Sequence, residues 1–100
     1  MNEVVFEGFD WDDGNWPKCG KHGMTRAEIE EVFLNTPAIK PHPNHSQVEE
    51  RMKAIGKTDE GRAAYVSFTL RPSRAGGALI RPVSARYMHR KEVKKYEQDN

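Results

Sequence analysis

Histidine and arginine side chains in two parts of the chain carry chemistry suited to a phosphate ester. Histidine as a residue type can serve as a general acid or base, and His22, which follows Lys21, is the first candidate for this role. The guanidinium groups of Arg71, Arg81 and Arg86 are planar forks that bind phosphate oxygens. We expect these groups to converge on one site, with Lys21 adding charge. The alternative is that His22 only pins its turn and that Lys21 is solvated.

Glu50 and Arg51 are neighbouring charged residues that can take part in the same chemistry. The Glu50 carboxylate can act as a general base while Arg51 clamps a phosphate. A cross-strand ion pair, with a value of at most about 1 kcal/mol, is the alternative explanation. Tyr65 and Tyr87 can stack on a nucleobase, and the alternative for both is packing within the fold.

Two short spacings also resemble pairs of zinc ligands. They are Cys19-x-x-His22 and His42-x-x-His45. Structural zinc sites usually contain more thiolate, and the second pair falls in a proline-rich segment. We therefore expect no metal and no cofactor, with His42 and His45 in a surface loop. A zinc-bound interaction domain is kept as a third hypothesis.

The clearest element that positions these groups is a helix beginning after Thr25. Thr25-x-x-Glu28 is a capping box, and Met24 before the cap can pack on Ile29 as a hydrophobic staple. The helix should end near Asn35, ahead of Pro37. A short helical turn over 15–20 is expected to hold the segment that carries His22.

Residues 62–71 alternate strictly between apolar and polar side chains, which predicts a half-buried antiparallel strand. One face is expected to hold Ala64, Val66, Phe68 and Leu70, and the other Tyr65, Ser67, Thr69 and Arg71. Further strands are expected over 4–11, 50–56 and 79–87, with a short edge strand at 38–39. A basic helix over 89–98, with Val93 and Tyr96 as its apolar stripe, closes the chain.

These elements predict an α+β fold in one domain spanning residues 1–100. The expected antiparallel β-sheet is packed by N-terminal helices on one face and followed by a C-terminal basic helix. The other sheet face holds polar and basic side chains and stays available for a ligand.

The positions of Arg81 and Arg86 set a geometric condition on the expected site. The two positions differ by an odd number, so a regular strand would place them on opposite faces. Pro82 between them lacks a backbone N–H and therefore predicts an edge position or a bulge. A bulge would put both arginines on one face. Without it, one of them belongs to a partner interface or pairs with the acidic N-terminal segment.

Charge is unevenly distributed over the 100 residues, although the net charge is only +1. Residues 1–17 contain five acids and no lysine or arginine, whereas residues 71–96 contain eight lysines and arginines against one acid. This asymmetry indicates an anionic partner for the C-terminal part. The single cysteine excludes an internal disulfide, and the chain lacks an apolar run of the roughly 18 residues that span a membrane. We expect a cytoplasmic protein without membrane contact.

Four ordered stretches resemble the BrnT toxin family. They read FDWDDGN at 9–15, KCGKHGM at 18–24, EERMKAIG at 49–56 and IRPVSARYM at 80–88, the last followed by Lys91, Glu92 and Tyr96. The chain departs from the family in having Met24 where many members have valine, and in a connection over 72–78 that is longer than a tight hairpin. Neither departure removes a chemical group.

The resemblance implies a ribonuclease toxin of a type II toxin–antitoxin pair, with a fold similar to that of the RelE and ParE toxins. It implies a BrnA-type antitoxin that covers the toxin and binds operator DNA, and a toxin dimer within that complex. The activity implied is RNA cleavage that inhibits translation and growth.

RNA cleavage through the 2′-hydroxyl needs two proton transfers and positive charge on the phosphorane, and this route needs no metal. The residues that we expect to be catalytic are His22, Glu50, Arg81 and Arg86. The residues that we expect to bind RNA are Lys21, Arg51, Arg71 and Tyr87. A non-catalytic module that binds nucleic acid or protein through the basic strand and helix fits the charge asymmetry equally well. It would show salt-sensitive binding without cleavage.

Overall fold

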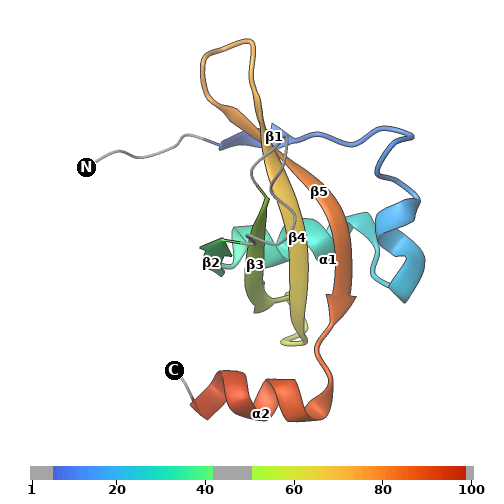
Figure 1. The fold of residues 1–100 in the computed structure, drawn as a ribbon, viewed down its shortest axis with the longest axis vertical. Helices are drawn as coiled ribbons and strands as arrows, with labels where there is room; N and C mark the ends of the chain where they lie inside the picture. Colours follow the sequence, from blue (N-terminus) through green and yellow to red (C-terminus); the bar gives the residue numbers. More distant parts are fainter. Residues whose placement is uncertain (1–5, 42–50, 99–100) are drawn as a thin grey trace.

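A computed structural model describes residues 6–41 and 51–98 of the chain. Its elements are β1 (Phe6–Phe9), the 3-10 helix η1 (Lys18–His22), α1 (Arg26–Leu34), β2 (Ala38–Pro41), β3 (Met52–Lys57), β4 (Ala63–Pro72), β5 (Ala78–Tyr87) and α2 (Arg90–Gln98) (Figure 1). Three residues singled out in the sequence, His42, His45 and Glu50, lie outside the described residues.

The strands form a mixed sheet in the order β1-β5-β4-β3-β2. Neighbours β2 to β5 pair antiparallel, as expected, but β1 runs parallel to β5. The expectation of a wholly antiparallel sheet is therefore wrong, and so is the expectation of helices as the N-terminal elements, because a strand comes first. The cause is that the β4–β5 hairpin offers an open edge at Ala78–Ile80, where Phe6–Phe9 can add in parallel.

The capping box predicted at Thr25 is confirmed. The Thr25 hydroxyl accepts a hydrogen bond from the Glu28 backbone at 3.1 Å, and the Glu28 carboxylate accepts one from the Thr25 backbone at 2.9 Å. The bonds satisfy donors that the first turn of a helix leaves free. With its start fixed, α1 lays Ile29 and Val32 on the sheet, where both are fully buried.

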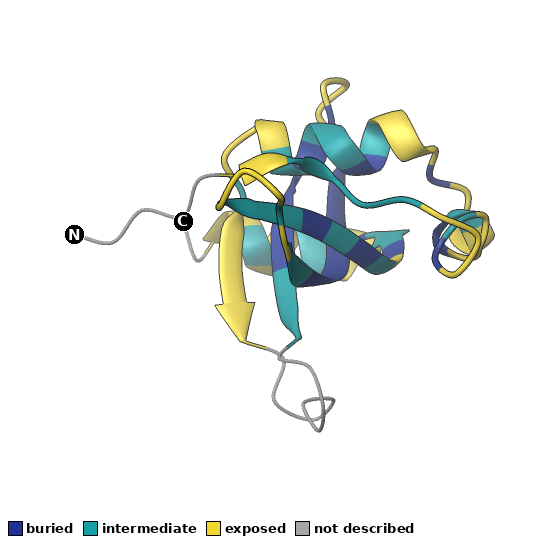
Figure 2. Cartoon of the chain, turned by 90° about the horizontal axis from the view of Figure 1, so that it is seen from above, coloured by how far each residue is buried: buried dark blue, intermediate teal, exposed yellow. Residues whose placement is uncertain are grey.

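The alternation in β4 places its apolar residues on the α1 face, where Ala64, Val66 and Phe68 are buried in the main core (Figure 2). Polar residues on the opposite face are less exposed than expected, since Ser67 and Thr69 are buried as well. These two short side chains in the middle of the sheet are therefore largely hidden from solvent.

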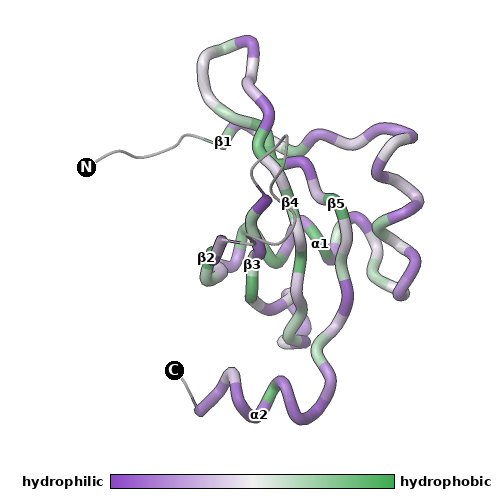
Figure 3. The backbone as a smooth tube through the Cα atoms, in the orientation of Figure 1, coloured by the Kyte–Doolittle hydropathy of each residue, from purple (hydrophilic) through white to green (hydrophobic). Residues whose placement is uncertain are grey.

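Helix α2 covers one end of the second sheet face. It is hydrophilic along most of its length (Figure 3), and within it Val93 and Tyr96 pack against a small cluster that contains Ile55 and Met88. The stripe predicted for this helix is confirmed. Within the described ranges, no helix is long and apolar enough to cross a membrane.

The irregularity predicted at Pro82 is present in β5. Ser67 of β4 pairs with Ser84 and the next residue, Phe68, pairs with Pro82, so Val83 is an extra residue. This bulge shifts the alternation of β5 by one residue. Arg81 and Arg86 therefore lie on the same face of the sheet, the face that also carries their β4 partners Thr69 and Tyr65.

The segment before α1 is held in place by Asn15 and ends in η1. A short helical turn was expected here over 15–20. The buried Asn15 side chain donates to the carbonyls of Asp10 and Pro82, each at 2.9 Å. Gly20 packs under the Trp16 ring so closely that a Cβ atom would lie 2.7 Å from it. These contacts hold the segment beside β5 and set the position of His22.

Candidate active site

His22 and Arg86 meet in one pocket although they are far apart in the sequence. The pocket has a volume of about 360 Å³ and is lined by His22, Lys53, Tyr65, Ser67, Ser84, Ala85 and Arg86. It lies on the sheet face opposite α1. A pocket that joins a histidine with two cations, two serine hydroxyls and a phenol has the groups needed to bind and cleave a phosphodiester.

Strand register explains why most of these side chains are together. Lys53 pairs with Ser67 and Ser67 with Ser84, which forms one row across three strands. Tyr65 pairs with Arg86 in the adjacent row on that face. Side chains two residues apart along a strand share a face, so the two rows build a continuous polar surface.

His22 reaches this surface around the edge of β5. Strand β1 pairs only with Ala78–Ile80, so η1 packs beside the remainder of β5 rather than a further strand. His22 ends η1 and is exposed, and Gly23 after it adopts a left-handed φ of 94°. The turn therefore presents the imidazole to the pocket while the chain leaves for α1.

Arg86 is held by a carboxylate from α2. Its Nη1 and Nη2 donate to the two carboxylate oxygens of Glu92 at 2.8 and 2.9 Å. The Glu92 carboxylate also accepts a hydrogen bond from the His89 backbone at 2.8 Å. The bond with Arg86, followed by that with His89, lowers the pKa of Glu92 to about 2, and Glu92 in turn raises the pKa of Arg86.

Tyr65 lies between two cations at the floor of the pocket. The Arg86 Cζ and the Lys53 Nζ are each 4.7 Å from its ring centroid, which is cation–π distance. Burial, followed by the nearby Glu92 carboxylate, raises the pKa of Tyr65. The phenol therefore stays protonated at neutral pH and can donate a hydrogen bond.

Ser67 has a buried hydroxyl that the described residues do not satisfy. Its Oγ has no hydrogen-bond partner among them, and the same holds for Thr69 Oγ1 two residues along β4. A buried hydroxyl without a partner costs free energy, about 1–3 kcal/mol in typical cases. Because Ser67 also lines the pocket, a bound ligand can supply the missing partner.

Arg81 lies outside this pocket, although it was expected to share a phosphate with Arg86. Its guanidinium binds Asp10 at 3.1 Å and both oxygens of Asp12 at 3.0 Å. Its partner in β4 is Thr69, four residues from the partner of Arg86, which corresponds to roughly 13 Å along a strand. The bulge and the pairing with the acidic N-terminal segment, which were expected as alternatives, are thus both present. A contact between Arg81 and phosphate stays a prediction.

Tyr87 faces the α1 side of the sheet. Its hydroxyl donates to Glu28 at 2.5 Å and the Arg62 Cζ lies 3.4 Å from its ring centroid. Burial, with a further contribution from Glu28, raises its pKa to about 12. These contacts favour the packing alternative.

The other predicted residues that the structure describes do not line this pocket. Lys21 is exposed beside His22, and half-buried Arg51 precedes β3. Arg71 pairs with Leu79 near the far end of the hairpin and engages in interactions of its own. Their contacts with RNA stay predictions, as does any role of Glu50.

Lys53, Ser67, Ser84 and Glu92 were not predicted as site residues. The sequence did indicate on which face Ser67 lies, because Ser67 alternates with core residues in β4. Lys53 lies on the same face of the sheet, in β3. Only the pairing of strands shows that these side chains adjoin each other.

Cys19 and His22 have the spacing of a pair of zinc ligands. Cys19 is buried with 1% of its surface exposed, and burial raises its thiol pKa to about 11. Within residues 6–41 and 51–98, no group of three or more histidine, cysteine or acidic side chains could hold a metal ion.

Comparison with known families identifies one match over most of the chain. The model of the family described as "Ribonuclease toxin, BrnT, of type II toxin-antitoxin system" matches residues 11–92. The match includes η1, α1, all strands except β1, and the start of α2. A search of curated proteins finds no match.

Proposed function

The chain belongs to the BrnT family of ribonuclease toxins of type II toxin–antitoxin systems, and from this premise we propose that it cleaves RNA in the pocket shared by His22 and Arg86. Membership implies an RNA substrate and a cognate antitoxin. The observation that carries the proposal is the presence of an exposed imidazole and a guanidinium in a single pocket.

In the proposed reaction, the 2′-oxygen of RNA attacks the adjacent phosphorus and the bond to the 5′-oxygen breaks. The 2′-hydroxyl loses a proton and the leaving oxygen gains one. His22 supplies one of these transfers, because imidazole exchanges protons near neutral pH. Glu50 is our candidate for the other. Histidine and carboxylate suffice for both transfers, so we propose a metal-independent reaction.

Charge on the phosphorane is stabilised by Arg86 and Lys53. Arg86 binds phosphate with the same two nitrogens that now bind Glu92, so RNA takes the place of that carboxylate. Ser67 donates its unpartnered hydroxyl to a phosphate oxygen. Preorganised donors of this kind act on the transition state without having to reorganise.

The remaining predicted residues act outside the pocket in this proposal. Lys21, Arg51 and Arg71 contact the RNA backbone in this proposal. Arg81 and Tyr87 are the two predicted residues whose present partners support structural roles instead.

For the assembly we propose a BrnA-type antitoxin that covers the pocket, a toxin dimer within the complex, and operator DNA bound through the antitoxin alone. Residues 1–100 act as one ribonuclease domain with a RelE/ParE-like fold. Release of the toxin inhibits translation and growth.

Replacement of His22 tests the chemistry directly. We expect His22→Ala to reduce RNA cleavage by about 10²–10⁴-fold, the usual contribution of general acid–base catalysis. The assay uses purified protein and labelled RNA in the presence of EDTA. His89→Ala is the matched control, because His89 is also exposed but lies outside the pocket.

Cleavage by His22→Ala at the rate of the unmodified protein would overturn the role of His22. Cleavage that stops in EDTA would overturn metal independence. RNA binding that is salt-sensitive but never followed by cleavage would support a binding module instead.

A further inference from the structure

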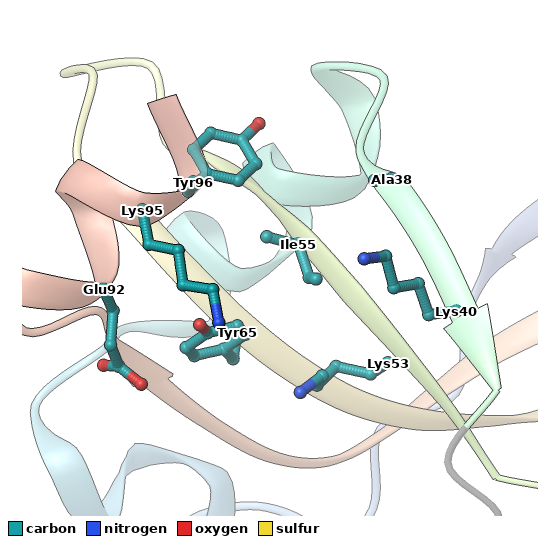
Figure 4. Close-up of a pocket in the computed structure, with 8 residues that line it drawn as sticks. All are labelled: Ala38, Lys40, Lys53, Ile55, Tyr65, Glu92, Lys95 and Tyr96. Atoms are coloured by element: carbon teal, nitrogen blue, oxygen red, sulfur yellow. The ribbon is translucent and has the colours of Figure 1, made fainter. Parts of the chain in front are cut away.

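A second pocket adjoins the candidate active site beneath α2. It has a volume of about 430 Å³ and is lined by Ala38, Lys40, Lys53, Ile55, Tyr65, Glu92, Lys95 and Tyr96 (Figure 4). Lys53 and Tyr65 line both pockets, so a ligand can pass from one to the other. The volume lies in the range of about 300–1,000 Å³ that is typical of small-molecule sites.

Three ammonium groups from three separate elements surround this pocket. Lys40 belongs to β2, Lys53 to β3 and Lys95 to α2, and the side chains of Lys40 and Lys95 approach from opposite sides (Figure 4). Among the described residues that line the pocket, Glu92 is the only one with a carboxylate, and it is bound to Arg86. Among the described residues, none of the three lysines forms an ion pair with a carboxylate.

This arrangement of like charges opposes folding. Lys40 and Lys53 are direct partners on antiparallel strands, where like charges destabilise the sheet. Lys95 adds a third positive charge to the same space. A bound anion would relieve the repulsion, so the pocket has the electrostatics of a site for phosphate.

Apolar and aromatic groups form the rest of the lining. Ile55 lies at the centre of the floor, with Tyr96 on the α2 side and Tyr65 at the boundary with the first pocket (Figure 4). Nucleobases stack on such rings with about 1–3 kcal/mol per base. The pocket therefore combines a surface for a base with charge for a phosphate.

We propose that this pocket binds one unpaired nucleotide of the RNA, next to the phosphate cleaved at His22 and Arg86. The inference rests on the proposed function. The nucleotide is unpaired because its base enters between α2 and β2, whereas a base in duplex RNA stays stacked inside the helix. The substrate at this position is thus single-stranded.

The test compares three lysine variants with one non-cleavable probe. The probe is a fluorescent single-stranded RNA of eight nucleotides with 2′-O-methyl groups, and binding is followed by fluorescence anisotropy. Lys40→Ala and Lys95→Ala each remove one charge from the pocket. Lys94→Ala is the control, because it removes the same charge from an exposed position of α2 that does not line the pocket.

We expect Lys40→Ala and Lys95→Ala each to weaken binding about fivefold, and to reduce the slope of log K against log salt by about 0.7, the value for one phosphate contact of a single strand. Lys94→Ala should change binding less than twofold. When the probe is annealed to its complement, the unmodified protein and the three lysine variants should bind the duplex equally. Tyr96→Leu, which keeps apolar packing, should weaken single-strand binding at least about fivefold, the lower end of the range for one stacked base.

Equal effects of all three lysine variants, or equal losses with the duplex, would overturn the nucleotide site while leaving the activity intact. Whether the activity is intact is read separately, from cleavage of unmodified RNA by the unmodified protein. Absence of that cleavage would overturn the proposed function and the nucleotide site with it.

Discussion

Arg81 and Arg86 lie on one face of one strand, and carboxylates hold both, but their surroundings differ. The Arg81 side chain is 15% exposed and binds Asp10 and Asp12, which belong to the segment that connects β1 to η1. The Arg86 side chain is 40% exposed, lines a pocket and has one carboxylate partner among the described residues, Glu92. A cation is available to a ligand only where its partners can be replaced.

The contacts around Arg81 hold the N-terminal segment against β5. Asp12 also accepts a hydrogen bond from the Gly14 backbone at 2.7 Å, and a Cβ atom on Gly14 would lie 2.9 Å from Arg81 Nη2. Arg81 thus fills a space that the acidic turn closes around it. Arg86 has open volume on its free side, which is where a phosphate can enter.

The largest effect that separates the two arginines is expected from Arg86→Ala. Loss of a preorganised charge at the phosphorane should reduce cleavage about 10²–10³-fold. Initial rates with labelled RNA measure this effect, and Arg74→Ala, at an exposed position of the β4–β5 hairpin, is the control. A rate within threefold of the unmodified protein would remove the distinction between Arg86 and Arg81.

Arg81→Ala should mainly change stability. The substitution leaves Asp10 and Asp12 without their guanidinium partner, and we expect the free energy of unfolding to fall by about 1–2 kcal/mol. Urea unfolding followed by circular dichroism measures the change. Cleavage per folded molecule should stay within about threefold. A hundredfold loss in a protein that remains folded would instead place Arg81 in catalysis, as the sequence predicts.

The smallest expected effect is on the pH dependence of stability, and it concerns Glu92, the carboxylate partner of Arg86. Glu92 has its pKa lowered from 4.5 to about 2 by Arg86 and the His89 backbone. Its contribution to stability is therefore complete above pH 4.5 and is lost as the pH falls towards 2. In Glu92→Gln, unfolding free energy should depend less on pH in that window. An unchanged pH dependence would show that the pair with Arg86 does not stabilise the fold.

Local patterns predicted much of this fold. The Thr25 capping box, the alternation in β4 and the bulge next to Pro82 are all consequences of neighbouring residues, and all three are present. The parallel addition of β1 to β5 was not predictable in this way. It depends on an edge left free about 70 residues later in the chain.

In the candidate site, too, local features were predictable and long-range contacts were not. His22 and Arg86 were identifiable by residue type, and the structure places them in one pocket. The partners of Arg81 come from the other end of the chain. The charge pattern indicated the acidic N-terminal segment as one possible partner, but it did not decide between Arg81 and Arg86. Lys53 and Ser67 needed the pairing of β3 with β4, because only the register places a lysine beside a buried hydroxyl.

The extra residue in β5 has a consequence for how chains of different length can share this architecture. Val83 is the one position between Arg81 and Arg86 with no partner on β4. A chain lacking it would keep Pro82 opposite Phe68 and Ser84 opposite Ser67, so every later side chain would retain its face. A deletion at Ala85 would instead turn Arg86 towards the core. Length variation in this strand is therefore tolerable at Val83, and a sequence alignment of shorter relatives should open its gap there.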